Sequence, residues 1–455
     1  MAPLSDQRPA RHVEVHDLCM PSVASSISAT STSWGDTTRP SQRFSGEQRI
    51  HEAVLSSFSD QVPNQINLLL QLSPTKWKRL LHWLDINGLA LYFLDRFDQL
   101  ELLDALPKLI VEGLQRRMKD NTQRTCGMVD ESVAIQFEFQ KAALSYAVMK
   151  GISLSPWSVP RPELRHQFDL DYLLAEQNAS EARRILERRG YRLFAVSGQT
   201  LEFKINETPN VSMKDLYKDL SYRSVELHLE SGTAAGQVSR LDRVWYREIQ
   251  GITMPVFSPV DLFLGQAMHA FKDVCSAFCR AAHLLEFYRH VLVRREDDAF
   301  WHELRARTAD DRKTCFAIGV LTYLITSIMG NFAPEALTAW TVEVLPLPML
   351  LWVDWYGRRT TFGKHPGTKF YLILQKEFEV AGVSTKRATK KSLLPTRLPP
   401  AVVRAAADET FLTCIVRHRV QIRFIFSRIR FHLVEGLRYA IESYRWRRRL
   451  DRLSS

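Results

Sequence analysis

Two carboxylates lie two residues apart in an apolar run, and their spacing points to metal chemistry. Asp169 and Asp171 belong to the segment Phe168-Asp-Leu-Asp-Tyr172. Side chains alternate with a period of two along a β-strand, so a strand here would direct both carboxylates to one face of a sheet. Their Cα atoms would be roughly 6.5 Å apart, given a rise of about 3.3 Å per residue. Carboxylates at that spacing can share a divalent cation between their oxygens.

A second segment supplies a third carboxylate. Residues 224–230 alternate between apolar and polar side chains, and the polar positions include Glu226 and His228. This alternation indicates a strand with one buried face. Nucleotidyl transfer needs about three carboxylates, because one metal ion bridges the triphosphate and a second lowers the pKa of the attacking hydroxyl. Gly151, which lacks a Cβ, would let a triphosphate approach the backbone closely.

These residues also have ordinary structural interpretations. Asp169 and Asp171 could form a solvated strand face or cap the following turn, and Glu226 alone could be a surface acid. His228 lies between two acids and could serve a structural hydrogen bond or catalysis. Arg165 could pair with Asp169 or Asp171 rather than with a phosphate.

Several short motifs occur together in a fixed order and resemble a known family. They are Met149-Lys-Gly-Ile-Ser-Leu154, Arg165 followed by the strand Phe168–Leu174, Leu186-Glu-Arg-Arg-Gly-Tyr191, and Val225-Glu-Leu-His-Leu229. This order resembles the bacterial "uncharacterised nucleotidyltransferase" family of the polymerase-β-like nucleotidyltransferase superfamily. Ser258-Pro259-Val-Asp-Leu-Phe-Leu264, with His269, is similar to the family's next helix. The resemblance covers roughly residues 70 to 330.

The resemblance implies metal-dependent nucleotidyl transfer on a small mixed sheet with flanking helices. Mg²⁺ (or Mn²⁺) would be held by Asp169, Asp171 and Glu226, with Glu226 as ligand or base. The triphosphate would lie near Lys150 and Gly151. Arg165 would neutralise phosphate charge. His228 matches the family's histidine, for which the resemblance implies no particular role.

The chain departs from the family pattern at two positions. The superfamily's nucleotide loop usually has Gly-Gly or Gly-Ser, whereas Gly151 is followed by Ile152-Ser153. Leu229 replaces the usual Trp. The first departure lies in the triphosphate loop, and neither changes the three acids.

We expect an α+β protein, with a small mixed β-sheet nucleotidyltransferase core flanked by N- and C-terminal helical regions. The patterns divide the chain into a disordered N-terminal segment (1–46), an N-terminal helical region (47–130), a nucleotidyltransferase-like core (131–257), a helical domain (258–345) and a C-terminal region with a basic Arg-rich helix (346–455). Within the core, they predict helices over Ser132–Met149 and Asn178–Arg189, strands over Tyr191–Val196 and Thr200–Ile205, and a hairpin over Val244–Met254.

Positive charge gathers at the C-terminal end. The chain of 455 residues has a net charge of +11, which favours an anionic partner such as a nucleotide, a nucleic acid or a membrane surface. Between residues 417 and 455, eleven Arg and three acids give +8. Aromatic residues are interleaved with these Arg residues, as in an RNA- or membrane-binding strip. An amphipathic helix with a solvated or acid-paired Arg face would have the same pattern, so residues 417–455 are a candidate docking region for an anionic partner.

The composition favours a cytoplasmic protein. The six cysteines are scattered without a CxxC motif, which is typical of reduced, buried thiols. Residues 1–45 are rich in Ser, Thr, Pro and Arg and lack the apolar region of a secretory signal. Thr314 to Pro334 is long enough to cross a bilayer, but Thr, Ser, Asn and Gly dilute it. We therefore expect a buried core helix there and no transmembrane span.

The sequence is compatible with two functions. The first is a metal-dependent nucleotidyltransferase that moves an NMP unit from an NTP, such as ATP, to an unknown acceptor (sugar, protein or RNA). The second is a non-catalytic nucleotide- or partner-binding protein whose Arg-rich C-terminal helix docks to RNA or an anionic surface. The departure at Ile152-Ser153 favours the second function, whereas the ordered motifs favour the first.

Overall fold

A computed structural model describes most of the chain. The described residues are 46–60, 64–205, 215–219, 223–231, 238–249, 251–363, 366–384, 392–393 and 410–454. The segment 1–46, which was expected to be disordered, lies outside these ranges apart from Gly46, the first residue of α1.

The first part of the described chain is helical. Its helices are α1 (Gly46–Ser56), α2 (Asn67–Leu70), α3 (Pro74–Asn87), α4 (Ala90–Gln99) and α5 (Lys108–Lys141). Helix α3 begins at Pro74, where the fixed φ of proline suits a first helical position. It ends at Asn87, and Gly88 follows as the capping residue with a φ of +72°, which glycine adopts at little cost. The buried side chains of Trp77, Leu84 and Phe93 contribute to the larger of two apolar cores.

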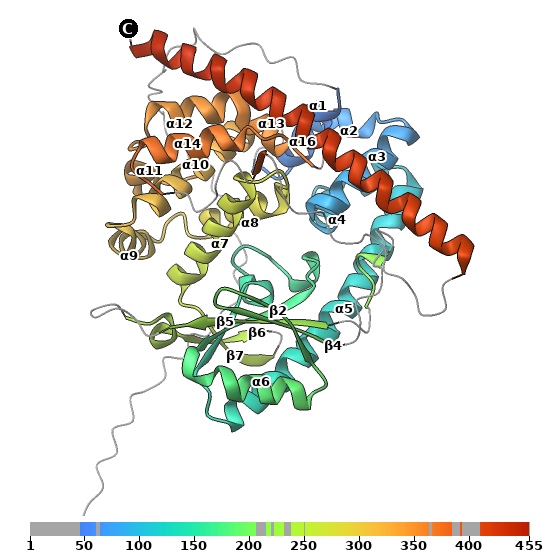
Figure 1. Cartoon of the computed structure of the whole chain (residues 1–455), viewed down its shortest axis with the longest axis vertical. Coiled ribbons are helices and arrows are strands. Elements are labelled where there is room, and N and C mark those ends of the chain that lie inside the picture. Colours follow the sequence, from blue (N-terminus) through green and yellow to red (C-terminus); the bar gives the residue numbers. More distant parts are fainter. Residues whose placement is uncertain are drawn as a thin grey trace, which may run out of the picture. The chain divides into compact units, whose positions relative to one another are not determined.

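Residues between 146 and 256 form a seven-stranded mixed sheet, drawn in the lower part of Figure 1. Its strands are β1 (Tyr146–Met149), β2 (Asp169–Ala175), β3 (Arg192–Ser197), β4 (Thr200–Ile205), β5 (Arg223–Glu230), β6 (Trp245–Ile249) and β7 (Ile252–Val256). The strand order is β3-β4-β5-β2-β1-β7-β6. The pairs β2–β5 and β1–β7 are parallel and the other pairs are antiparallel. The predicted α+β fold with a mixed sheet is confirmed.

One prediction inside the core is wrong. The helix expected over Ser132–Met149 ends at Lys141, and Tyr146–Met149 forms β1. The chain turns at Ala143, whose φ is +51°, and β1 then pairs with β2 along its whole length. Backbone hydrogen bonds to a distant strand therefore outweigh the helical periodicity that continues through this segment.

The sheet has one apolar face, which carries the smaller core. Leu170, Tyr172 and Leu174 of β2 lie in this core together with buried residues of α5 and of α6 (Ala179–Arg188). Figure 1 shows α5 and α6 beside the sheet. Because side chains alternate along β2, Asp169 and Asp171 must face the other side.

The described residues that follow β7 are mostly helical. Their helices are α7 (Pro259–Val274), α8 (Ala281–Val293), α9 (Asp298–Thr308), α10 (Arg312–Met329), α11 (Glu335–Thr341), α12 (Leu347–Trp352), α13 (Arg358–Thr361), α14 (Tyr371–Val380) and α16 (Phe411–Ser454). The predicted start at Ser258-Pro259 is confirmed, because the Ser258 hydroxyl accepts a hydrogen bond from the Asp261 amide. Helix α10 is largely buried, as expected for the uncharged stretch that begins at Thr314. None of the described helices is long and apolar enough to cross a membrane.

Candidate active site

The pairing of β2 with β5 brings the three predicted acids to one face of the sheet. The two strands are parallel neighbours, with Asp171 opposite Glu226 and Asp169 opposite Ser224. Adjacent strands lie about 4.8 Å apart, so the Asp171 and Glu226 side chains extend from neighbouring positions. Leu170 and Val225 point to the opposite, apolar face. The alternation that buries one face of each strand therefore collects the acids on the other.

A histidine joins two of these acids. His228 Nε2 lies 2.8 Å from Asp171 Oδ1 and 3.4 Å from Glu226 Oε2. One ligand atom from each of these three residues lies within 4.8 Å of the others, so the group could hold a metal ion. Burial lowers the pKa of His228, but hydrogen bonds to the two carboxylates outweigh it and the net pKa is raised. In this arrangement the ring donates its Nε2 hydrogen to the Asp171 carboxylate, which can only accept.

Asp171 is held in its ionised form by two cations. Burial would raise its pKa, but hydrogen bonds from His228 and Lys150 bring it below the usual range. Lys150 Nζ lies 3.1 Å from Asp171 Oδ1. Asp169 has the opposite balance, because burial and the charges of Asp171 and Glu226 raise its pKa to about 6. Three hard oxygen donors that repel one another suit a divalent cation such as Mg²⁺, which would relieve that repulsion.

The turn after β1 positions Lys150 and Gly151. Met149 is paired with Asp171 across the β1–β2 ladder, so the next two residues emerge beside the acids. Both have left-handed backbones, with φ of +50° at Lys150 and +49° at Gly151. A Cβ at Gly151 would lie 2.4 Å from Gln167 Oε1. Glycine is therefore needed both for the conformation and for the close contact.

Arg165 pairs with a glutamate of α8 and not with Asp169 or Asp171, the two partners that the sequence suggested. Its Nε donates to Glu286 Oε1 of α8 at 3.1 Å, and Tyr92 donates to the same oxygen at 3.0 Å. Arg165 therefore does not pair directly with Asp169 or Asp171. Both acids still stabilise its charge through space and help to raise its pKa against the effect of burial.

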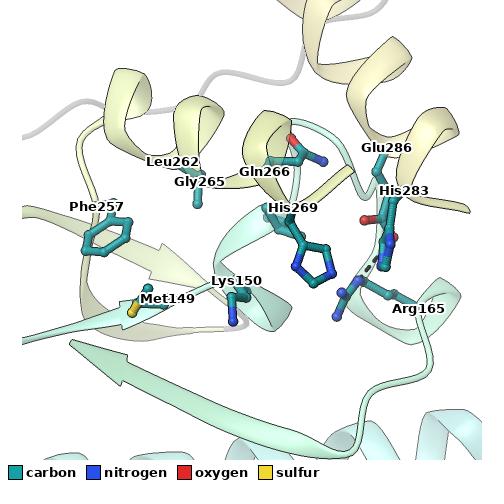
Figure 2. Close-up of a pocket in the computed structure, with 11 residues that line it drawn as sticks. Met149, Lys150, Arg165, Phe257, Leu262, Gly265, Gln266, His269, His283 and Glu286 are labelled. Atoms are coloured by element: carbon teal, nitrogen blue, oxygen red, sulfur yellow. Dashed lines mark hydrogen bonds and ion pairs between the residues drawn. The ribbon is translucent and has the colours of Figure 1, made fainter. Parts of the chain in front are cut away.

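A pocket beside the acids is lined by two of the predicted nucleotide-binding residues (Figure 2). Lys150 comes from the turn after β1, Arg165 from the segment before β2, and His269 and His283 from α7 and α8. A second hollow runs past Gly151, Gln167, Asp169 and Asp171. Cationic and acidic side chains thus line two adjoining depressions.

The family assignment comes from a comparison of the whole chain. The model of a family described as "Uncharacterised nucleotidyltransferase" matches residues 73–324, which is more than half of the chain. The chain belongs to this family. The matched range includes β1, β2, β5, α7 and α8, and with them all the site residues described above.

Comparisons with curated proteins and with solved structures add less information. A search of curated proteins finds no match. Among solved structures, the chain is similar to an antigenic nucleotidyltransferase-like protein from Paracoccidioides brasiliensis at 12% sequence identity and a TM-score of 0.29. That alignment covers 48% of this chain and 98% of the other.

Sequence reasoning missed part of the candidate site. His269 and Asp273 lie one turn apart on α7, and His283 Nδ1 lies 2.8 Å from Asp273 Oδ2. These three residues form a second group whose atoms could hold a metal ion. The spacing of His269 and Asp273 was the available signal, but nothing in the sequence brings His283 to them. Glu286 was also missed, because only the folded chain places α8 beside Arg165.

Proposed function

We propose that this protein is a divalent-metal-dependent nucleotidyltransferase that moves an NMP unit from an NTP to an acceptor. The observation that carries the proposal is the placement of Asp169, Asp171 and Glu226 on one polar face of two parallel strands. Membership of the nucleotidyltransferase family supports the same reaction class. A labelled-transfer assay would identify the nucleotide, with ATP as the first candidate. It would also identify the acceptor, which is a sugar, a protein or an RNA.

In this proposal the acids hold the ions, and the turn after β1 meets the triphosphate. Asp169, Asp171 and Glu226 would hold Mg²⁺ or Mn²⁺, which supplies charge neutralisation and lowers the pKa of the acceptor hydroxyl. Lys150 is 3.1 Å from Asp171, within reach of a phosphate placed next to the carboxylates. Arg165, held by Glu286, would add long-range positive charge without leaving its buried position.

Glu226 is placed to accept a proton, and His228 is placed to orient Glu226. Glu226 would accept the proton of the acceptor hydroxyl. His228 Nε2 lies 3.4 Å from Glu226 Oε2 and already carries the hydrogen that it donates to Asp171, so it would orient the two carboxylates and would not receive that proton. Thr200 Oγ1 lies 3.2 Å from the other ring nitrogen and fixes the orientation of the ring. This contact keeps Nε2 directed towards both carboxylates.

The proposal is tested with α-labelled nucleotides and a panel of sugar, protein and RNA acceptors. We expect Asp169→Asn and Asp171→Asn each to slow label transfer by at least about a hundredfold, or about 2.7 kcal/mol. The control is Glu187→Gln on α6, whose carboxylate pairs with Arg183 at 2.7 Å on the opposite side of the sheet. Equal transfer by Asp171→Asn and the control would reject the assignment of the acids.

The alternative of a nucleotide-binding protein without turnover predicts a different result. Calorimetry would detect NTP binding that depends on Mg²⁺, while no pyrophosphate would be released with any acceptor. Such a result would support the role of Lys150 and Gly151 in nucleotide binding. It would contradict the role of Glu226 as a base.

A further inference from the structure

Helix α16 contacts the rest of the protein along one narrow stripe. Its covered positions recur every three or four residues, as one side of a helix does, and include Gln421, Ile425, His432, Glu435, Tyr439 and Trp446. Trp446 donates to Glu377 of α14 at 2.8 Å, and His432 lies 2.8 Å from Lys369 Nζ. The remaining circumference of the helix is exposed.

The opposite side of α16 is apolar. We call it the α16 apolar face, defined by the exposed residues Ile415, Ile422, Phe426, Ile429, Leu433 and Leu437. These residues follow one another at helical spacing over roughly 33 Å, at 1.5 Å per residue. Fifteen of the 28 large apolar residues that are exposed in the described chain lie on α16. An exposed apolar surface of this extent marks an interaction site.

Arginine is the charged residue that accompanies this face. Arg419, Arg423 and Arg430 lie along one edge of this face, and all three are exposed. Within the described ranges, no acidic side chain forms an ion pair with any of the three. The acids Glu435 and Glu442 lie on the covered side, where they bind Arg438 and Arg445. The apolar face therefore carries positive charge without compensating negative charge.

We propose that the α16 apolar face binds the surface of an anionic lipid bilayer, with the helix lying in the plane of the interface. Isoleucine, leucine and phenylalanine would enter the acyl boundary while the arginines contact the headgroups, as in interfacial amphipathic helices. The helix does not cross the membrane, because no described helix is apolar enough to do so. The family match ends at residue 324, so this surface is additional to the nucleotidyltransferase region.

Two other occupants fit the surface less well. Single-stranded RNA is bound by basic grooves with aromatic side chains that stack on bases, whereas five of the six residues of this face are aliphatic. A second copy of α16 would bring two helices of net charge +8 together and would bury Arg419 and Arg423 without acids. An anionic bilayer accommodates both the aliphatic side chains and the charge.

The experiment is flotation of the full chain with vesicles of phosphatidylcholine, with and without phosphatidylglycerol. We expect binding to the anionic vesicles and a decrease with added salt. Phe426→Ser with Leu433→Ser should weaken binding at least about tenfold. Arg419→Gln with Arg423→Gln should weaken binding to anionic vesicles about thirtyfold, at about 1 kcal/mol for each arginine.

The matched control is Phe137→Ser on α5. Phe137 is 64% exposed and Phe426 is 68% exposed, so both substitutions remove a similar apolar surface without opening a core. Phe137→Ser should float like the wild type, and circular dichroism should show all variants folded. Flotation does not depend on nucleotidyl transfer. If the protein transfers no nucleotide, the membrane proposal is therefore unaffected.

Three results would overturn the proposal. The first is the absence of flotation with anionic vesicles. The second is retention of single-stranded RNA on filters without vesicle binding, with loss in the arginine variant. The third is a dimer in light scattering that Phe426→Ser with Leu433→Ser dissociates, again without vesicle binding.

Discussion

Gly151→Ala would measure how firmly the turn after β1 is held beside the acids. The φ of +49° at Gly151 costs an alanine about 1–2 kcal/mol. The new Cβ would also lie 2.4 Å from Oε1 of buried Gln167. Moving that side chain off its preferred rotamer costs about 1 kcal/mol more. We expect the free energy of unfolding to fall by about 2–3 kcal/mol in urea titrations followed by tryptophan fluorescence.

A second glycine separates the two contributions. Gly198 has a φ of +60° but no atom within 4 Å of its notional Cβ, so Gly198→Ala carries only the backbone cost of about 1–2 kcal/mol. The difference between the variants, about 1 kcal/mol, isolates the contact with Gln167. Adding Gln167→Ala to both alanine variants should remove the difference. If the two single variants lose equal stability, Gln167 does not restrain the turn and the reasoning fails.

Two further predictions concern the helices beside the site. Glu286→Gln leaves Arg165 buried without its carboxylate, and we expect a loss of about 3 kcal/mol in the same titration; an unchanged midpoint would contradict this. Burial and the nearby Arg294 hold the pKa of His290 at about 3, whereas the unfolded chain protonates it below about pH 6.5. Stability should therefore be complete above about pH 6.5 and fall below it by about 1.4 kcal/mol per pH unit for this residue. His290→Asn should flatten that dependence between about pH 7 and pH 5, and an unaltered slope would show that other groups cause it.

Local patterns were enough to find the strands that carry the acids. The alternation around Asp171 predicted β2, and the alternation around Glu226 predicted β5, because each strand buries one face. The same rule predicted that the acids of each strand share a face. That β2 and β5 are parallel neighbours, with these two residues in register, required the folded chain.

The features that the sequence did not predict depend on contacts between distant segments. Residues 146–149 were assigned to a helix because their apolar pattern continued that of α5, and only pairing with β2 and β7 makes them a strand. Arg165 and Glu286 are 121 residues apart, and neither has a local signal for the other. Side-chain pairing of this kind depends on how α8 packs, which no short pattern encodes.

Helix α5 has a consequence for how the protein unfolds. Leu114, near its start, belongs to the larger core, whereas Met128 and Phe139, further along, belong to the smaller core under the sheet. One continuous helix of 34 residues is therefore shared by both cores. Melting either core removes packing from a helix that the other requires, so the two should lose structure in a single cooperative step. Cutting the chain after residue 130, where two of the predicted regions meet, would divide this helix and remove packing from both cores.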